Sequence, residues 1–196
     1  MSRPDRKNQF TATLFRPAEP GGDPSWSFVV LPKEVSDALP RRGRTTVEGT
    51  INGCPFVATL DPDGRRSHWL KVSEELRSAA SATVGGRVTV EIRPVKREPE
   101  PELPSDFQKA LEAAPEARRV WEATTTIARV DWIHWMTSAK QAKTRVKRID
   151  DACEMLAAGK KRVCCFDPSG YYSKAFQSPA PVPTTLLDDA QNPLST

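Results

Sequence analysis

Histidine and cysteine, the side chains most often used for nucleophilic catalysis and transition-metal binding, are scarce in this sequence of 196 residues. The full set is His68, His134, Cys54, Cys153, Cys164 and Cys165. No two cysteines have the Cys-x-x-Cys spacing that is common in zinc sites. Cys164 and Cys165 are adjacent, and adjacent side chains of a strand point to opposite faces, so we expect them not to share one ion. We therefore predict no metal site and no bound cofactor.

Nucleophilic catalysis also lacks a suitable base in this sequence. A cysteine nucleophile is normally activated by a neighbouring histidine. His134 is the histidine in the same half of the chain as Cys164 and Cys165, and it lies between Trp132 and Trp135, where a packing role is more common. No Gly-x-Ser-x-Gly sequence marks a serine nucleophile. We expect a protein that works by binding and is not an enzyme.

Positive charge is concentrated in one segment of the second half of the chain, where eight of 23 residues are basic. These residues are Lys140, Lys143, Arg145, Lys147, Arg148, Lys160, Lys161 and Arg162. Such a face suits phosphates or an acidic partner. The alternative is a solvated helix face, and it carries more weight because Asp150 and Asp151 lie at helical spacing from the basic residues.

Aromatic side chains give the other candidates for binding. Trp132 and Trp135 are three residues apart, so they lie on one side of a helix. They either pack to seal the helical region or line a groove for an apolar or aromatic ligand, and packing is the commoner role in a small domain. His68 and Trp69 are candidates for lining a ligand pocket. The candidate ligand or partner residues are His68, Trp69, Trp132, Trp135, Lys140, Lys143, Arg145 and Arg148.

The first half of the chain contains a clear β-hairpin centred on Asn52-Gly53. Apolar and polar residues alternate on both sides of this pair, from Arg44 to Leu60. Asn-Gly is the preferred pair for a two-residue type I′ turn, because both positions need a positive φ. We therefore expect Gly53 to have a positive φ.

The hairpin separates two stretches with the same order of features. Phe10–Glu48 and Phe56–Glu91 each read as strand, strand, short helix and strand. A three-stranded unit cannot bury its apolar face alone, so two joined units should close on each other. We predict a six-stranded barrel with pseudo-twofold symmetry, capped by two short helices, in which Phe10 matches Phe56 and Val47 matches Val90.

The sequence divides into four segments. Residues 8–95 form the barrel, and residues 96–104 form a linker because prolines and charges alternate there. Helical spacing then predicts a small four-helix bundle over 105–162, whose last helix has an apolar stripe. The stripe is Ala142, Val146, Ile149, Cys153 and Leu156. A C-terminal extension, 163–196, follows, and its Ser/Pro-rich composition predicts disorder after about residue 177. The fold class is α+β.

Composition limits the setting and the partners. The chain has 29 basic and 25 acidic residues, a net charge of +4, which is too mild to favour nucleic acid as the partner. No apolar run is long enough to span a membrane, and the first residues lack the apolar core of a signal peptide. Free cysteines are typical of a reducing compartment. We expect a cytoplasmic protein whose partner is an unidentified protein or small molecule.

Several motifs resemble a known bacterial family. The segments Thr46–Phe56 and Val84–Val90 resemble a small β-barrel domain of unknown function that often precedes a YdeI/OmpD-associated domain. Three further segments resemble the helical YdeI/OmpD-associated (bacteriocin-protection) domain: Trp132-Ile133, Ala139-Lys140 and Lys143–Ile149. Together these likenesses cover about residues 8–162, and Val163–Ser173 is similar to an extension in some members. The resemblance implies a double-split, AbrB-like barrel and brings no catalytic residues.

The resemblance also implies a setting, which is envelope stress or protection from antimicrobial peptides and bacteriocins. Our first interpretation is therefore a non-enzymatic binding protein in that setting. The second is a nucleic-acid-binding regulator that uses the AbrB-like barrel and the basic helix. The third is a small-molecule binder with a pocket between barrel and bundle.

Overall fold

The computed structural model describes residues 9–183 and contains two compact units. The first unit combines residues 9–95 with residues 169–183, and the second unit comprises residues 96–168. The chain therefore leaves the first unit, forms the second, and returns to the first.

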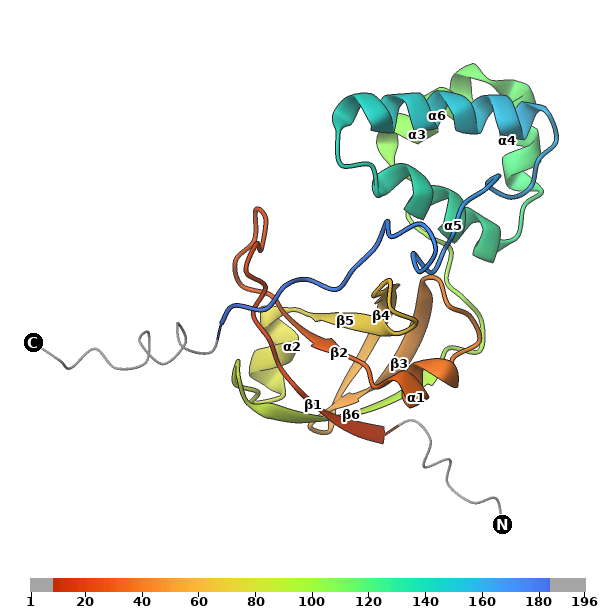
Figure 1. Cartoon of the computed structure of the whole chain (residues 1–196). Coiled ribbons are helices and arrows are strands. Elements are labelled where there is room, and N and C mark those ends of the chain that lie inside the picture. The colour runs from red at the N-terminus through yellow and green to blue at the C-terminus, as the bar shows by residue number, and fades with distance from the viewer. Residues whose placement is uncertain (1–8, 184–196) are drawn as a thin grey trace, which may run out of the picture. The chain divides into compact units, whose positions relative to one another are not determined.

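The first unit is a nearly closed barrel of six strands and two short helices (Figure 1). Its strands are β1 (Gln9–Thr13), β2 (Ser27–Val30), β3 (Thr45–Ile51), β4 (Cys54–Pro62), β5 (His68–Val72) and β6 (Arg87–Pro94). They pair in the order β1-β6-β3-β4-β5-β2, and every pairing is antiparallel. Backbone hydrogen bonds between Phe15 and Phe28 join the chain after β1 to β2 and so link the two edges of the sheet. The predicted six-stranded barrel is confirmed.

The central hairpin turns at Asn52-Gly53, as predicted. Asn52 has φ 48° and Gly53 has φ 82°, and the flanking residues Ile51 and Cys54 are partners in the β3–β4 pairing. Asn52 also ties the turn to β6, because its side-chain Oδ1 accepts a hydrogen bond from the backbone N–H of Thr89 at 2.9 Å. The turn is thus held by a side chain as well as by its backbone preference.

The barrel interior is filled by side chains that alternate along the strands. β6 shows the period most clearly, since Val88, Val90 and Ile92 are buried while the residues between them are exposed. The helices α1 (Lys33–Asp37) and α2 (Glu74–Ala79) complete this core. α2 begins at Ser73, whose hydroxyl accepts a hydrogen bond from the N–H of Leu76.

The second unit is a bundle of four helices. They are α3 (Ser105–Ala113), α4 (Pro115–Glu122), α5 (Thr126–Thr137) and α6 (Ala142–Ala157). Pro115 stands at the first position of α4, where its missing N–H is no loss. Ser138 ends α5, and α6 begins after Gln141.

The apolar stripe predicted for α6 is buried only in part. Ile149 and Leu156 belong to the bundle core, but Val146 is 60 % exposed and Ala142 is also exposed. The core is completed by large side chains of the other helices, chiefly Phe107, Trp121, Trp132 and Met136. The start of α6 therefore presents both its charged and its apolar side chains to solvent.

The C-terminal segment returns to the barrel unit through specific contacts. The N–H of Ala18 donates to the carbonyl of Ala180, and the N–H of Val182 donates to the carbonyl of Arg16, at 2.8 and 2.9 Å. Phe176 lies against Gly64, where a Cβ atom would overlap the Phe176 carbonyl oxygen. Composition predicted disorder after about residue 177, but backbone pairing holds the segment as far as Val182; residues 184–196 lie outside the described part of the chain.

Candidate functional site

The eight candidate residues fall in both units. His68 and Trp69 belong to the barrel unit, and the other six belong to the helical unit. Within each unit the structure places the candidates in different environments, which differ in burial and in the partners they already have.

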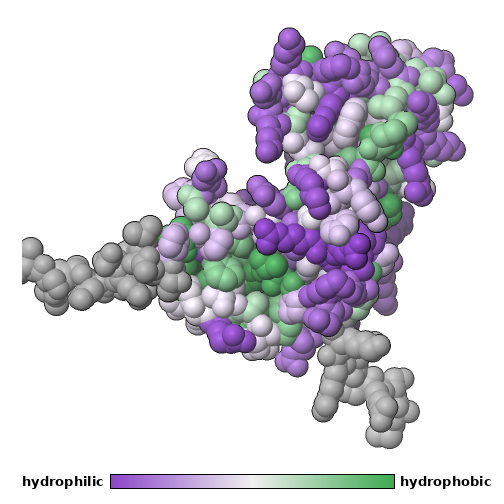
Figure 2. Space-filling model, viewed as in Figure 1, coloured by the Kyte–Doolittle hydropathy of each residue, from purple (hydrophilic) through white to green (hydrophobic). Residues whose placement is uncertain are grey.

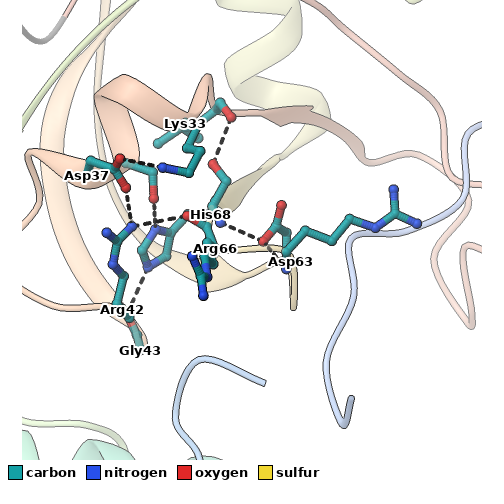
Figure 3. Close-up of polar contacts among 11 residues, drawn as sticks. Lys33, Asp37, Arg42, Gly43, Asp63, Arg66 and His68 are labelled. Atoms are coloured by element: carbon teal, nitrogen blue, oxygen red, sulfur yellow. Dashed lines mark hydrogen bonds and ion pairs between the residues drawn. The ribbon is translucent and has the colours of Figure 1, made fainter. Parts of the chain in front are cut away.

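His68 lies inside a hydrogen-bonded network of the barrel unit (Figure 3). The ring is fully buried, and each ring nitrogen has a partner. Nε2 lies 3.0 Å from the carbonyl oxygen of Gly43, which can only accept, so Nε2 carries the proton. Nδ1 therefore accepts the hydroxyl hydrogen of Ser36, at 2.7 Å. This arrangement fixes a neutral imidazole in one tautomer.

The electrostatics of the network match this neutral form. Burial lowers the pKa of His68, and this effect exceeds the opposing ones of the Gly43 hydrogen bond and of Asp63. Ser36 and His68 form a hydroxyl–imidazole pair like that of a nucleophile and its base. Ser36 is only 1 % exposed, however, so a substrate has no access to its oxygen. The pair connects α1 to β5 and does not form a ligand surface.

The loop before β5 holds His68 in place. Asp63 Oδ1 accepts hydrogen bonds from the backbone N–H groups of Arg65 and Ser67, both at 2.7 Å. Ser67 in turn donates its hydroxyl to the carbonyl of Leu31. Sequence reasoning did not single out these residues, although an Asp before a Gly-containing loop is a usual signal for such a turn.

Trp69 belongs to an aromatic cluster of the barrel unit. Its ring stacks with that of Trp26 at 6.1 Å between centroids and meets Phe28 edge-on at 6.2 Å. Trp26 donates its indole N–H to the carbonyl of Pro20, and the Lys71 ammonium lies 4.9 Å from the Trp26 ring centroid. Figure 2 shows hydrophobic side chains gathered on the visible face of the barrel unit, among hydrophilic ones. Trp69 is half-buried, and its environment is one of packing.

The two tryptophans of α5 have separate roles. Trp132 is fully buried in the bundle core. Trp135 is half-buried, and its ring meets Trp132 edge-on at 6.0 Å between centroids. Arg148 of α6 lies over the Trp135 ring at 5.4 Å and donates hydrogen bonds to the Trp135 carbonyl and to Ser138 Oγ. Arg148 therefore binds the end of α5 to α6.

Two other basic residues of α6 are neutralised by acids. Arg145 makes a bidentate ion pair with Asp106 of α3, at 2.7 and 3.0 Å. This pair lowers the pKa of Asp106 and raises that of Arg145, mainly through its hydrogen bonds. Lys147 pairs with Asp151 one turn further along α6. Acids near the helix thus remove much of the positive field that the sequence suggests.

Lys140 and Lys143 stand apart from these pairs. Both are exposed, and within residues 9–183 neither has an acidic partner in an ion pair. They lie on either side of Gln141, the residue that precedes α6 and makes no capping side-chain hydrogen bond, and the first turn of α6 holds no acid. We call Trp135, Lys140, Lys143 and Arg148 the α5–α6 corner. It combines free positive charge with a half-exposed indole.

Two family models match the chain. One, described as a domain of unknown function (DUF1905), matches residues 10–92. The other, described as "Bacteriocin-protection, YdeI or OmpD-Associated", matches residues 100–159. The chain thus carries a DUF1905 domain followed by a YdeI/OmpD-associated domain. A comparison with curated proteins found no match.

The YdeI/OmpD-associated match contains all four helices and hence the α5–α6 corner. The DUF1905 match contains the six barrel strands from Phe10 to Ile92, with the His68 network and the Trp26 cluster. The C-terminal segment that begins at Lys160 lies beyond both matches. None of the helices in residues 9–183 has the length and apolar character needed to cross a membrane.

Proposed function

We propose that this protein is a non-catalytic binding protein that acts in protection against bacteriocins or in envelope stress. Its partner is an acidic peptide or protein segment, and the contact surface is the α5–α6 corner. One observation carries the proposal: Lys140 and Lys143 remain exposed where α5, which carries the half-buried Trp135, connects to α6, whereas Arg145 and Lys147 are already paired. A carboxylate partner would meet unpaired ammonium groups and an aromatic face there.

The barrel unit supports the non-catalytic part of the proposal. The pair that most resembles catalytic machinery, Ser36 and His68, is buried, and both ring nitrogens of the histidine are used in hydrogen bonds. The description of the matched family names protection and association, and no reaction.

Nucleic acid is the alternative partner. Its support comes from Lys160, Lys161 and Arg162, which are exposed just after α6 and add to the positive charge of the unit. Binding to phosphates would require several such contacts, and each would contribute about one unit to the salt slope of the binding constant. The pairing of Arg145 and Lys147 argues against a continuous phosphate-binding surface.

The test compares two double variants with the same change in charge. Lys140→Gln/Lys143→Gln alters the corner, and Lys160→Gln/Lys161→Gln is the matched control outside it. Binding of polyglutamate, single-stranded RNA and duplex DNA is followed by tryptophan fluorescence at several salt concentrations. We expect the corner variant to bind polyglutamate about threefold to tenfold more weakly and the control to match the unaltered chain.

Three results would contradict the proposal. The first is an equal loss of polyglutamate affinity in both variants, and the second is no binding of polyglutamate by the unaltered chain. The third is binding of nucleic acid that is tighter than binding of polyglutamate and has a steep salt slope. The last result would favour the alternative. Thermal unfolding of both variants checks that the fold is intact, since all four lysines are exposed.

We also infer that the barrel is a duplicated, double-split barrel of the AbrB-like type. Exchanging β1 with β4, β2 with β5 and β3 with β6 reproduces the same strand neighbours, as a pseudo-twofold axis requires. The registers correct one expected match. β1 pairs with β6 through Phe10 and Val90, and β4 pairs with β3 through Phe56 and Gly49. If the two halves are superimposed so that Phe10 matches Phe56, their pairing partners Val90 and Gly49 match each other. Val90 then corresponds to Gly49 and not to Val47, which lies two residues earlier in β3.

We place the protein in the cytoplasm, in agreement with its cysteine chemistry. All four cysteines are free thiols, which suits a reducing compartment. Fractionation of cells that produce the tagged full chain tests this placement, and recovery in the periplasmic fraction would contradict it.

A further inference from the structure

Cys164 and Cys165 lie at a tight turn after α6. The φ of Cys165 is 57°, in the left-handed region, so the chain reverses there and does not continue as a strand. The two Sγ atoms are 3.3 Å apart, and both side chains are exposed. The expectation that adjacent cysteines point to opposite faces is therefore wrong here, because it assumed strand geometry.

The residues on either side anchor this turn. Val163 packs against the core of the helical unit, and the Phe166 ring meets His134 edge-on at 5.7 Å between centroids. Two apolar anchors thus hold the ends of the turn, and the two thiols between them are exposed. The fold presents a pair of adjacent sulfur atoms to solvent.

We propose that Cys164 and Cys165 form a binding site for trivalent arsenic or antimony compounds. Thiolates are soft ligands, and two of them at this separation suit a centre whose bonds lie at narrow angles on one side. A linear two-coordinate metal needs its sulfur atoms on opposite sides. Zinc needs four ligands, and residues 9–183 hold no group of three or more His, Cys, Asp or Glu placed for an ion.

The binding step is an exchange of ligands without a change of oxidation state. A compound R–As(OH)₂ reacts with both thiols, so two As–S bonds form, two As–O bonds break, and the thiol protons leave in two water molecules. Neighbouring Cys164 raises the pKa of Cys165, which is therefore a thiol at neutral pH and carries one of those protons. Lys160 opposes this effect by favouring the thiolate.

Direct oxidation of the pair to a disulfide is less well suited to the geometry. Adjacent Cα atoms across a trans peptide are about 3.8 Å apart, and unstrained disulfides usually span about 4.4–6.8 Å. An arsenic bridge leaves the sulfur atoms close to their present separation. The two outcomes differ in mass, so one experiment separates them.

The test treats the full-length reduced chain with phenylarsine oxide and measures its intact mass and its free thiols. We expect one phenylarsenic group per chain, with two of the four thiols consumed. Cys164→Ser and Cys165→Ser should each weaken binding about 10²- to 10⁴-fold, because the second As–S bond is made within one molecule. Cys54→Ser and Cys153→Ser are the matched controls and should bind like the unaltered chain.

The reversal of binding gives a second readout. A small dithiol should release the group, and a monothiol at the same concentration should not. The proposal is overturned if Cys164→Ser or Cys165→Ser keeps full affinity, if either control loses it, or if the treated chain shows only the loss of two hydrogens that marks a disulfide. It is independent of the α5–α6 corner, so either proposal can fail alone.

Discussion

His68 is a buried titratable side chain whose hydrogen bonds match its neutral form. Ser36 donates to Nδ1, and Nε2 donates to the Gly43 carbonyl, so protonation of Nδ1 would require the Ser36 hydroxyl to turn its hydrogen away and accept instead. The pKa of His68 is lowered by burial. In the unfolded chain the ring has its ordinary pKa of about 6.5 and takes up a proton more readily.

This difference predicts how stability depends on pH. Below about pH 6.5, and down to the lowered pKa of the folded state, the unfolded chain binds more protons, so the free energy of unfolding rises with pH. The contribution of His68 is therefore complete above about pH 6.5 and is lost as the pH falls. One group changes stability by at most about 1.4 kcal/mol per pH unit. Urea unfolding of the full chain between pH 5 and pH 8 measures the slope.

Two variants separate titration of the ring from its packing. His68→Gln retains an N–H donor for Gly43 and removes the titration, so its slope between pH 5 and pH 6.5 should be smaller than that of the unaltered chain. Ser36→Ala should destabilise the fold by about 1–3 kcal/mol at pH 7, because Nδ1 loses its donor. An unchanged slope in His68→Gln would mean that another group carries the dependence.

At the residue scale, the sequence marked His68 as a candidate but not its environment. Its partner Ser36 is 32 residues away, and no local pattern connects a serine of one short helix with a histidine of a later strand. Lys140 and Lys143 are easier to place, because charged residues at the start of a helix are usually exposed. The partner of Arg145, Asp106, lies on another helix, and no local spacing favours it over Asp150 or Asp151.

Two glycines govern strand β3 and its hairpin for different reasons. Gly53 needs a positive φ, and a Cβ atom there would meet nothing within 4 Å. Gly49 has no such requirement, but a Cβ atom there would overlap the carbonyl oxygen of Glu91 in β6. The first glycine is needed for backbone conformation, and the second for the close approach of two strands.

Alanine substitutions should therefore differ in their effect. Gly53→Ala should destabilise the protein by about 1–2 kcal/mol through backbone strain alone. Gly49→Ala should cost more, about 2–4 kcal/mol, because β3 and β6 must separate locally. The midpoint of urea unfolding measures both. An effect of Gly49→Ala that is no larger than that of Gly53→Ala would mean that β3 and β6 are not in close contact at this position.

At the element scale, periodicity predicted the helices and strands well and their burial less well. The hairpin, the barrel strands and the four helices follow from turn chemistry, alternation and helical spacing. The stripe of α6 was correct at Ile149 and Leu156 but not at Val146, because periodicity defines a face and does not say how far a neighbouring helix extends along it. The prediction that Cys164 and Cys165 point to opposite faces of a strand was wrong, because a short apolar run gives no signal for a residue in the left-handed region.

At the scale of the whole molecule, the barrel unit is built from two distant parts of the chain. Residues 169–183 return to it after the helical unit. The Tyr171 ring contacts two cationic groups, with the Arg66 guanidinium 4.2 Å and the Lys174 ammonium 4.4 Å from its ring centroid. Composition predicted disorder after about residue 177 because the segment is rich in serine and proline; the contacts depend instead on glycines that admit Phe176 and on backbone pairing.

This architecture predicts that the C-terminal segment stabilises the barrel unit specifically. A chain ending at Pro168 loses the backbone hydrogen bonds to Arg16 and Ala18 and the packing of Phe176 on Gly64. Each hydrogen bond contributes about 0.5–1.5 kcal/mol, so the barrel unit should lose about 1–3 kcal/mol. The matched control is a chain ending at Pro183, which keeps every contact described above.

Amide hydrogen exchange resolves the two units in one experiment, because each amide reports the opening of its own region. Exchange should accelerate in β2 and β5 of the shorter chain and stay unchanged in α3–α6. Equal exchange in the two truncated chains would show that the returning segment adds no stability, and faster exchange in the helices would show that it acts on the other unit.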